Sequence, residues 1–291
     1  MIHLQNVSFQ YRKGKSIFKD LELNLNAGSI YGLLGKNGAG KTTLLRLINV
    51  LIFPTSGSVD ILGYPAEERH PEMLADICFV QEEPYIPNLS IIAFLYTYAP
   101  FYPNFDFDQF FKLITEFSLE GSLKLDKLSF GQKKKVMLSF ALASNARIVI
   151  LDEPTNGLDI PSKSQFRKLI TEAMLNDRMI IISTHQVRDM VNLIDPILII
   201  DEGQVVFNYS LEEIAEALVF EVHNTLTEPK DVLFSERISG GYITIRENTH
   251  EEFSNVDVEA LFNAILIKKE EIVKILEKHK TSHSTTQKLS K

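Results

Sequence analysis

The sequence has a single cysteine, no long apolar run and no excess of positive charge. Cys78 has no second thiol with which to form an internal disulfide, which fits a reducing cytosol. It stands in the apolar stretch 77–80, and we expect a buried core thiol there and not a nucleophile. The longest apolar runs, such as 148–151 and 197–200, have the length of a strand, whereas a membrane helix needs about 20 apolar residues. If the protein serves a membrane process, another chain must cross the bilayer.

The composition is that of an ordinary globular protein. Of the 291 residues, 45% are hydrophobic and 23% are charged, and the length favours one large domain, alone or with a smaller appendage. The net charge of -8 gives no general attraction to nucleic acid or anionic lipid, so no direct binding of nucleic acid is expected. Residues 1–11 alternate polar and apolar side chains, and we expect no secretory signal.

Short apolar strands alternate with helices through most of the chain. Residues 2–9 and 21–25 have the alternation of antiparallel strands, and the segment 90–127 is helical in pattern and rich in aromatic residues that we expect to be mostly core. Further strands are predicted at 29–34, 59–62, 77–80, 147–151, 179–183, 197–201 and 205–208, and helices at 42–51, 129–143, 161–174 and 186–193. The pattern predicts an α/β fold with a mostly parallel sheet covered on both faces, an N-terminal antiparallel β subdomain and a helical subdomain.

The pattern weakens after about residue 210. A helix at 211–218, a strand at 242–246 and a charged helical segment at 256–280 suggest a small α+β appendage. The polar residues 281–291 are predicted to be disordered. The predicted organisation is a main domain at 1–208 with its helical subdomain at about 84–144, an accessory region at 209–280 and a tail at 281–291.

Residues 35–42 match the pattern of a phosphate-binding loop in full, between a predicted strand and a predicted helix. Glycines let successive backbone N–H groups turn inward around an anion, and the helix N-terminus adds positive potential. Lys41 can reach the β- and γ-phosphates, and the Thr42 hydroxyl can ligate Mg²⁺. The residues expected to bind nucleotide here are Gly35, Lys36, Asn37, Gly38, Ala39, Gly40, Lys41, Thr42 and the adjacent Thr43.

Two acidic residues, Asp152 and Glu153, follow the apolar strand 148–151. A buried strand places Asp152 at the carboxyl edge of the sheet, beside the phosphate-binding loop, where it can hold Mg²⁺. Glu153 then lies next to it and can polarise an attacking water. Alone, such a pair can be a strand end that faces solvent. Together with the loop at 35–42, it indicates a nucleoside triphosphatase.

The peptide Leu-Ser-Phe-Gly-Gln at 128–132 narrows this assignment, because here the sequence resembles the ATP-binding-cassette (ABC) family. The signature peptide of that family has this form and this position. At the start of a helix, Ser129 and Gly131 offer a hydroxyl and backbone N–H groups to an anion, and Gln132 completes the peptide. Taken alone, the pentapeptide is equally well explained as a helix N-cap.

Other landmarks of the family then follow in order. The resemblance implies that Gln81 senses magnesium and contacts the membrane partner, and that Asp159, in the loop 157–159, communicates between paired subunits. It makes His185 the switch histidine at the γ-phosphate and Tyr11 the aromatic that stacks on adenine. Singly, each has a simpler interpretation: a solvated loop residue for Gln81, a helix cap for His185 and an exposed strand-end aromatic for Tyr11.

The resemblance covers roughly residues 1–208 and departs from the commonest signature at Phe130, where glycine is usual. The serine and second glycine are kept, so we expect altered packing at the dimer face and not lost chemistry. The lysines at 133–135 fit a solvated helix face better than a further phosphate or partner contact.

The resemblance implies an ATPase that works as a head-to-tail homodimer or paired cassette around two ATP molecules with Mg²⁺. The catalytic group would comprise Glu153, His185, Lys41 and Gln81, with Thr42, Gln81 and Asp152 as the metal ligands. Its partner would be a separate transmembrane permease that couples near Gln81 and residues 82–90, most simply for export. The expected location is cytoplasmic, on the inner face of the cell membrane.

Two other functional classes compete with the transport motor. A non-transport ABC ATPase acting on DNA or the ribosome is disfavoured, because each motif occurs once, no long coiled-coil insertion is present and the chain is acidic. A nucleotide kinase leaves residues 128–132, 157–159 and 185 unexplained.

Overall fold

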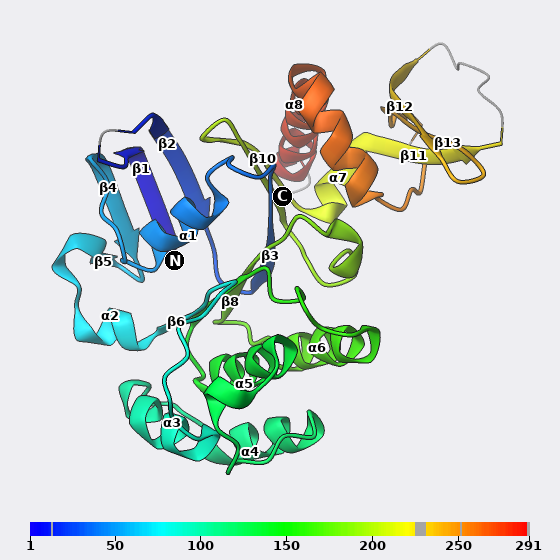
Figure 1. Ribbon diagram of the computed structural model, residues 1–291. Helices are drawn as coiled ribbons and strands as arrows, with labels where there is room; N and C mark the ends of the chain where they lie inside the picture. Colours follow the sequence, from blue (N-terminus) through cyan, green and yellow to red (C-terminus); the bar gives the residue numbers. More distant parts are fainter. Residues whose placement is uncertain (13, 225–230, 251, 290–291) are drawn as a thin grey trace.

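The computed structural model describes residues 1–12, 14–224, 231–250 and 252–289. An antiparallel sheet of four strands occupies the N-terminal part, with the order β2-β1-β4-β5 (Figure 1). Its strands are β1 (Ile2–Gln10), β2 (Ser16–Leu25), β4 (Ser56–Ile61) and β5 (Tyr64–Pro65). Alternate residues of β1, such as Ile2 and Leu4, are completely buried, as the alternating pattern predicted. The expected antiparallel β subdomain is therefore confirmed.

A six-stranded sheet with the order β10-β9-β3-β8-β7-β6 forms the centre of the molecule. Its strands are β3 (Ser29–Leu34), β6 (Ile77–Val80), β7 (Ile148–Asp152), β8 (Met179–Ser183), β9 (Ile197–Asp201) and β10 (Gln204–Tyr209). Every pairing is parallel except that of β10 with β9. All residues of β7 and β8 are buried, which is why these strands read as continuous apolar runs. The carboxyl ends of β3, β7 and β8 meet at one edge.

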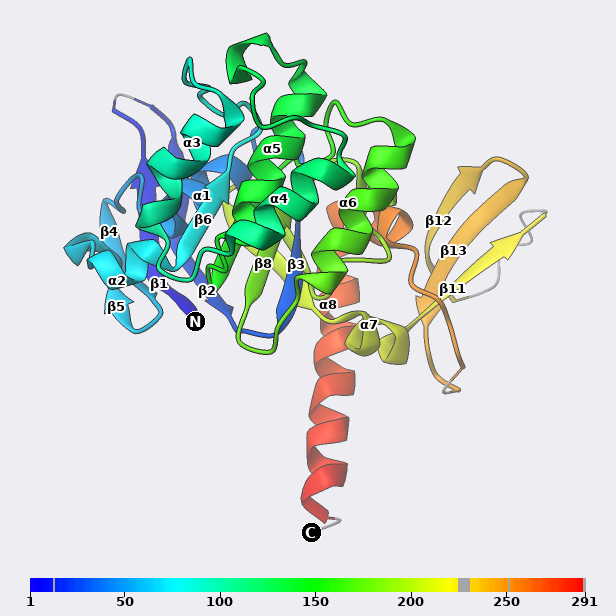
Figure 2. The ribbon, with the colours of Figure 1, turned by 90° about the horizontal axis from the view of Figure 1, so that it is seen from below.

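Helices cover both faces of this sheet. On one face, α1 (Lys41–Ile48) packs in an apolar cluster with the N-terminal sheet. On the other face lie α5 (Phe130–Ala143) and α6 (Ile160–Glu172), and α3 (Ile91–Tyr98) and α4 (Phe107–Glu116) extend this helical layer (Figure 2). The smaller elements are α2 (Pro71–Ala75), η1 (Ala66–Glu68), η2 (Ala99–Phe101), η3 (Leu125–Lys127) and η4 (Val187–Asp189).

The helical subdomain has an aromatic core. Phe110 is completely buried, and Phe94, Phe117 and Phe140 are nearly so. The rings of Phe94 and Phe140 meet edge to face, with centroids 5.2 Å apart. The expectation that most aromatics of the segment 90–127 are core is confirmed, although Tyr96, Phe101 and Phe107 remain exposed.

The C-terminal appendage is a three-stranded antiparallel sheet with the helix α7 (Leu211–Ala217) and the long segment α8 (Val258–Leu289), which kinks at Lys268. Its strands are β11 (Leu218–His223), β12 (Val232–Ile238) and β13 (Gly241–Glu247), with the order β11-β13-β12. The sequence predicted only the central strand, β13. The two edge strands escaped prediction because charged residues such as Glu221 and Glu236 interrupt their apolar residues.

Two segments differ from the secondary structure expected of them. The tail predicted to be disordered is helical from 281 to 289, where no glycine or proline ends α8, and residues 290–291 lie outside the described residues. The helix expected at 186–193 is reduced to the short η4, and the Glu153 and Thr184 side chains accept the N–H groups of His185 and Gln186 immediately before it. Across the described part of the chain, no helix combines the length and apolar character that a membrane span requires.

Candidate active site

The phosphate-binding loop connects β3 to the N-terminus of α1. Gly40, the N-cap residue of α1, has φ of +112°, and a Cβ there would lie 2.9 Å from the Phe18 ring. Only glycine fits this position without strain. The loop therefore presents backbone N–H groups and the positive end of α1 to an anion.

Lys41 lies beneath this loop and is almost completely buried. Its Nζ donates hydrogen bonds to the carbonyl oxygens of Gly35, at 2.6 Å, and Lys36, at 3.3 Å. Burial lowers the pKa of Lys41, while the nearby carboxylates of Glu153 and Asp152 act in the opposite direction. The ammonium is thus held where it can contact the phosphates of a nucleotide.

Asp152 joins three elements at the edge of the sheet. The Thr42 hydroxyl donates to its Oδ2 at 3.1 Å, and the Ser183 hydroxyl donates to its Oδ1. A carboxylate and a hydroxyl at this separation supply the oxygen ligands that Mg²⁺ prefers. The predicted metal ligands Thr42 and Asp152 are therefore brought together.

Glu153 is buried and pairs with His185. Its Oε1 lies 2.6 Å from Nδ1 of His185 and accepts the backbone N–H of the same residue at 3.0 Å. Its Oε2 is buried and has no hydrogen-bond partner among the described residues. An unpaired buried carboxylate oxygen is costly unless a ligand or water completes it. Glu153, the predicted base, and His185, the predicted switch histidine, are therefore hydrogen-bonded to each other, and Oε2 of Glu153 can accept a further hydrogen bond.

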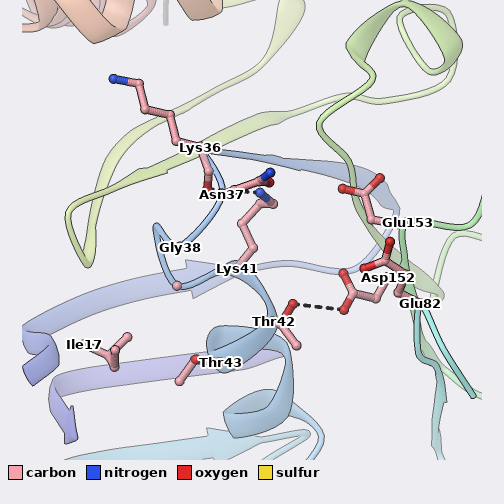
Figure 3. A pocket seen from close by; sticks show the side chains of 11 residues that line it. Ile17, Lys36, Asn37, Gly38, Lys41, Thr42, Thr43, Glu82, Asp152 and Glu153 are labelled. Carbon is pink, nitrogen blue, oxygen red and sulfur yellow. Dashed lines mark hydrogen bonds between the residues drawn. The ribbon is translucent and has the colours of Figure 1, made fainter. Parts of the chain in front are cut away.

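A cavity of about 290 Å³ opens between the loop and the two acids (Figure 3). Figure 3 shows Lys41, at the start of α1, facing Asp152 and Glu153, at the end of β7, across it. It is lined by Ile17, Lys36, Asn37, Gly38, Gly40, Lys41, Thr42, Thr43, Glu82, Asp152 and Glu153. Of the predicted loop residues, Gly35 and Ala39 lie buried behind this lining. N–H groups, an ammonium and carboxylates around one cavity fit a triphosphate with Mg²⁺.

The signature peptide lies outside this cavity. Ser129 caps α5 by accepting the Gln132 N–H, and the Gln132 side chain accepts the Ser129 N–H in return. Gly131 packs on the loop that precedes Asp159, since a Cβ on Gly131 would lie 2.7 Å from the Gly157 carbonyl oxygen. A second subunit would be needed for these residues to touch a nucleotide.

Asp159 begins α6, accepting the Ser162 N–H at 3.0 Å, and the hydrogen bonds from Ser162 lower its pKa. Phe130, the departure from the usual signature, covers Gly157 so closely that a Cβ on Gly157 would overlap its ring. Phe130 therefore tightens the packing between the signature peptide and this loop.

Two predicted residues stand apart from the phosphate cavity. Gln81 lines a separate groove with Tyr85 and Phe101, whereas its neighbour Glu82 lines the phosphate cavity. Tyr11 is 40% exposed, and its hydroxyl lies 3.4 Å from Oγ1 of Thr43. Their assigned roles, at the metal and at adenine, stay predictions.

Sequence reasoning missed Glu82, Asn156 and Lys134. Asn156 donates to Glu82 at 2.9 Å and accepts from Gln186 at 3.3 Å, and so joins the three loops around the site. Lys134, assigned with its neighbours to a solvated face, is instead completely buried. The apolar residues that follow it, Val136 to Ala143, indicate a buried helix and were the available signal.

The amino-acid sequence is similar to those of known ATP-binding proteins of transporters. Residues 18–156 match the model of a family described as ABC transporter. The chain is 29% identical over 221 residues to the ABC transporter ATP-binding protein YtrB of Bacillus subtilis (strain 168), covering 75% of each chain. It is 33% identical over 219 residues to the bacitracin transport ATP-binding protein BcrA of Bacillus licheniformis, covering 74% of this chain and 69% of BcrA.

A solved structure shares the fold. It is the dimeric post-hydrolysis state of the ATP-binding cassette MJ0796 bound to ADP and Pi, with a TM-score of 0.65 and 23% identity. The match covers 72% of this chain and 99% of that one.

Proposed function

The chain belongs to the ABC transporter family of ATP-binding proteins and is an ATPase, and we propose that it is the motor subunit that drives a separate membrane permease for export. The observation that carries the proposal is the convergence of the phosphate-binding loop with Asp152 and Glu153 on one cavity, with His185 hydrogen-bonded to Glu153. A loop that holds phosphate beside a carboxylate with a vacant oxygen is suited to ATP hydrolysis.

We propose that hydrolysis uses the residues around the cavity as follows. Glu153 orients the attacking water through Oε2 and takes its proton, while His185 fixes the carboxylate through Oε1. Lys41 stabilises the charge on the phosphate oxygens. Thr42 and Asp152, which lie together at the cavity, would hold the Mg²⁺ that accompanies ATP, with Gln81 as the predicted third ligand from the neighbouring groove. The ion would neutralise phosphate charge.

The active form proposed is a head-to-tail dimer. Ser129, Gly131, Gln132 and Asp159 lie on a surface away from their own cavity, so a second copy is the simplest source of an ATP for them to contact. Each ATP then joins the Lys41 loop of one subunit to the signature peptide of the other. Its γ-phosphate supplies the charge that favours closure. The dimeric MJ0796 cassette, which has the same fold, is consistent with this arrangement.

The permease is proposed to dock on the groove beside Gln81. This groove, of about 500 Å³, lies between β6 and the helical subdomain and contains the side chains of Tyr85, Phe101 and Tyr98. Tyr85 is 87% exposed and Phe101 is 69% exposed. Large exposed aromatics around a groove are typical of a surface that a partner covers. The subunit would then sit in the cytoplasm against the inner face of the cell membrane.

The test is capture of the tagged protein from detergent-solubilised native membranes, followed by mass spectrometry. A stoichiometric multi-span membrane protein is expected, and its loss is expected when Tyr85 and Phe101 are both replaced by serine. A matched control is Phe253→Ser, since Phe253 is 91% exposed but lies on the appendage. Ribosomal or DNA-bound partners without a membrane protein would overturn the permease assignment.

The direction of transport needs its own assay. The single cassette with a C-terminal extension resembles export-type systems, and the relative BcrA is named for bacitracin transport. In vesicles whose cassettes face outward, export corresponds to ATP-dependent uptake of labelled cargo. ATP-dependent release of preloaded cargo would contradict it.

A further inference from the structure

Lys134 is a completely buried lysine on the helix that begins with the signature peptide. Its Nζ donates to the carbonyl oxygen of Glu153 at 3.0 Å and approaches that of Asp152 at 3.4 Å. Burial lowers the pKa of Lys134, and the carboxylates of Glu82, Asp152, Glu153 and Glu83 oppose this shift. Burying an ammonium costs free energy unless it is paired. The carbonyl oxygens and the nearby carboxylates offset that cost for Lys134.

The residue that Lys134 contacts has an unusual backbone. Glu153 has φ of +46°, in the left-handed region that non-glycine residues rarely occupy. Such a conformation persists only where its surroundings enforce it. Here the Glu153 N–H donates to the Ser183 carbonyl at 3.0 Å, and the Glu153 carbonyl accepts from Lys134. These two bonds set the direction in which the carboxylate leaves the main chain.

Lys134 also contacts the signature peptide. Its Nζ lies 5.6 Å from the centre of the Phe130 ring, one helical turn earlier in α5. Phe130 in turn covers Gly157, in the loop that follows Glu153. One side chain therefore touches both the outward-facing signature peptide and the main chain of the catalytic carboxylate.

We propose that Lys134 is a positioning residue that fixes Glu153 and links it to the signature peptide of its own subunit. This inference rests on the proposed dimer, in which that peptide contacts the ATP of the other subunit. A shift of α5 on engaging the partner's ATP would move the Lys134 ammonium and with it the Glu153 carbonyl. The two ATP sites are thereby coupled through a direct contact within one chain.

The test compares Lys134→Met and Lys134→Arg in the full-length protein. Methionine keeps the volume but removes the donor, so kcat for ATP should fall by about 10- to 100-fold, the effect of a small misplacement of a catalytic group. KM should change by less than about 3-fold, because the nucleotide contacts remain. Arginine keeps charge and donor and should recover much of the lost kcat. The Hill coefficient for ATP should fall towards one in the methionine variant.

Lys135→Met is the matched control. Lys135 is the next residue of α5 and lies over the Phe117 ring, away from Glu153. Its replacement should leave kcat unchanged, because Lys135 does not contact Glu153. A wild-type kcat in Lys134→Met, or an arginine variant no faster than the methionine variant, would overturn the positioning role. An unchanged Hill coefficient would overturn the link between the two sites.

A second readout needs no nucleotide. Hydrogen exchange followed by mass spectrometry should show faster exchange of the peptide around 150–158 in Lys134→Met than in Lys135→Met, with the rest of the sheet unchanged. Equal exchange in both variants would overturn the inference. If the wild-type protein releases no phosphate, alone or in native membranes, the proposed function as an ATPase motor is wrong. The hydrogen-exchange result still tests whether Lys134 positions Glu153.

Discussion

Glu153 has its two carboxylate oxygens in different situations. Oε1 is bound by His185, and Oε2 is buried without a partner among the described residues. Because Oε2 is free to accept a hydrogen bond from water, replacing Glu153 by glutamine removes the base and keeps the shape. We expect Glu153→Gln to lower kcat by about 10²- to 10⁴-fold and to leave ATP bound in a stable dimer. Phosphate release and size-exclusion chromatography with ATP measure these effects.

The control for this variant is Glu172→Gln, the same change on the exposed surface of α6, where the carboxylate pairs with Lys168 of the same helix. It should leave kcat and the monomer–dimer equilibrium as they are. Normal steady-state hydrolysis by Glu153→Gln would remove Glu153 from the mechanism.

Cys78 is the other residue whose state the structure clarifies. The thiol is buried at the foot of the aromatic groove, and burial raises its pKa to about 11. It is therefore protonated at neutral pH, because its folded pKa lies well above that value. The expectation of a buried core thiol is confirmed.

At the scale of helices, two capping boxes occur among the residues that the structure describes, one in the signature peptide and one in the appendage. Ser129 and Gln132 start α5, and Ser210 and Glu213 start α7, with the same reciprocal hydrogen bonds. Loss of either serine hydroxyl should cost about 1 kcal/mol of unfolding free energy. Only Ser129→Ala should also lower ATP turnover, because only Ser129 belongs to the signature peptide.

Urea denaturation and phosphate release on Ser129→Ala and Ser210→Ala separate the two effects. Equal losses of stability with a selective loss of turnover in Ser129→Ala support the assignment. Equal turnover in the two variants would mean that Ser129 is an N-cap and nothing more.

At the scale of the whole molecule, the described residues form two apolar clusters, and the larger one runs from the main domain into the appendage. Leu261 of α8 is completely buried in the same cluster as Val149 of β7 and Phe166 of α6. Leu261→Ala should therefore lower the free energy of unfolding by about 2 to 5 kcal/mol. The loss should appear in a single transition, because the appendage and main domain share this core.

The free energy of unfolding and the number of transitions are measured by urea titration, followed by far-ultraviolet circular dichroism and by release of a fluorescent ATP analogue. Ile267→Ala, on the same helix but at a position 70% exposed, should change stability by less than about 0.5 kcal/mol. Two transitions, with the ATP-binding one unchanged in Leu261→Ala, would show that the appendage unfolds independently.

The sequence alone determined the α/β class, the phosphate-binding loop and the acidic strand end. These follow from local patterns: a buried strand is a run of apolar residues, and a loop that wraps phosphate needs glycines at fixed spacing. For the same reason, strands 29–34, 77–80, 179–183 and 197–201 were predicted with their observed bounds.

Only the tertiary structure decided which side chains meet. The pairing of Glu153 with His185, the left-handed backbone of Glu153 and the buried position of Lys134 each depend on elements far apart in the chain. The edge strands β11 and β12 of the appendage mix charged and apolar residues, so only their pairing with β13 identifies them as strands. Side-chain contacts and backbone strain arise when separate elements pack together, and no local pattern encodes them.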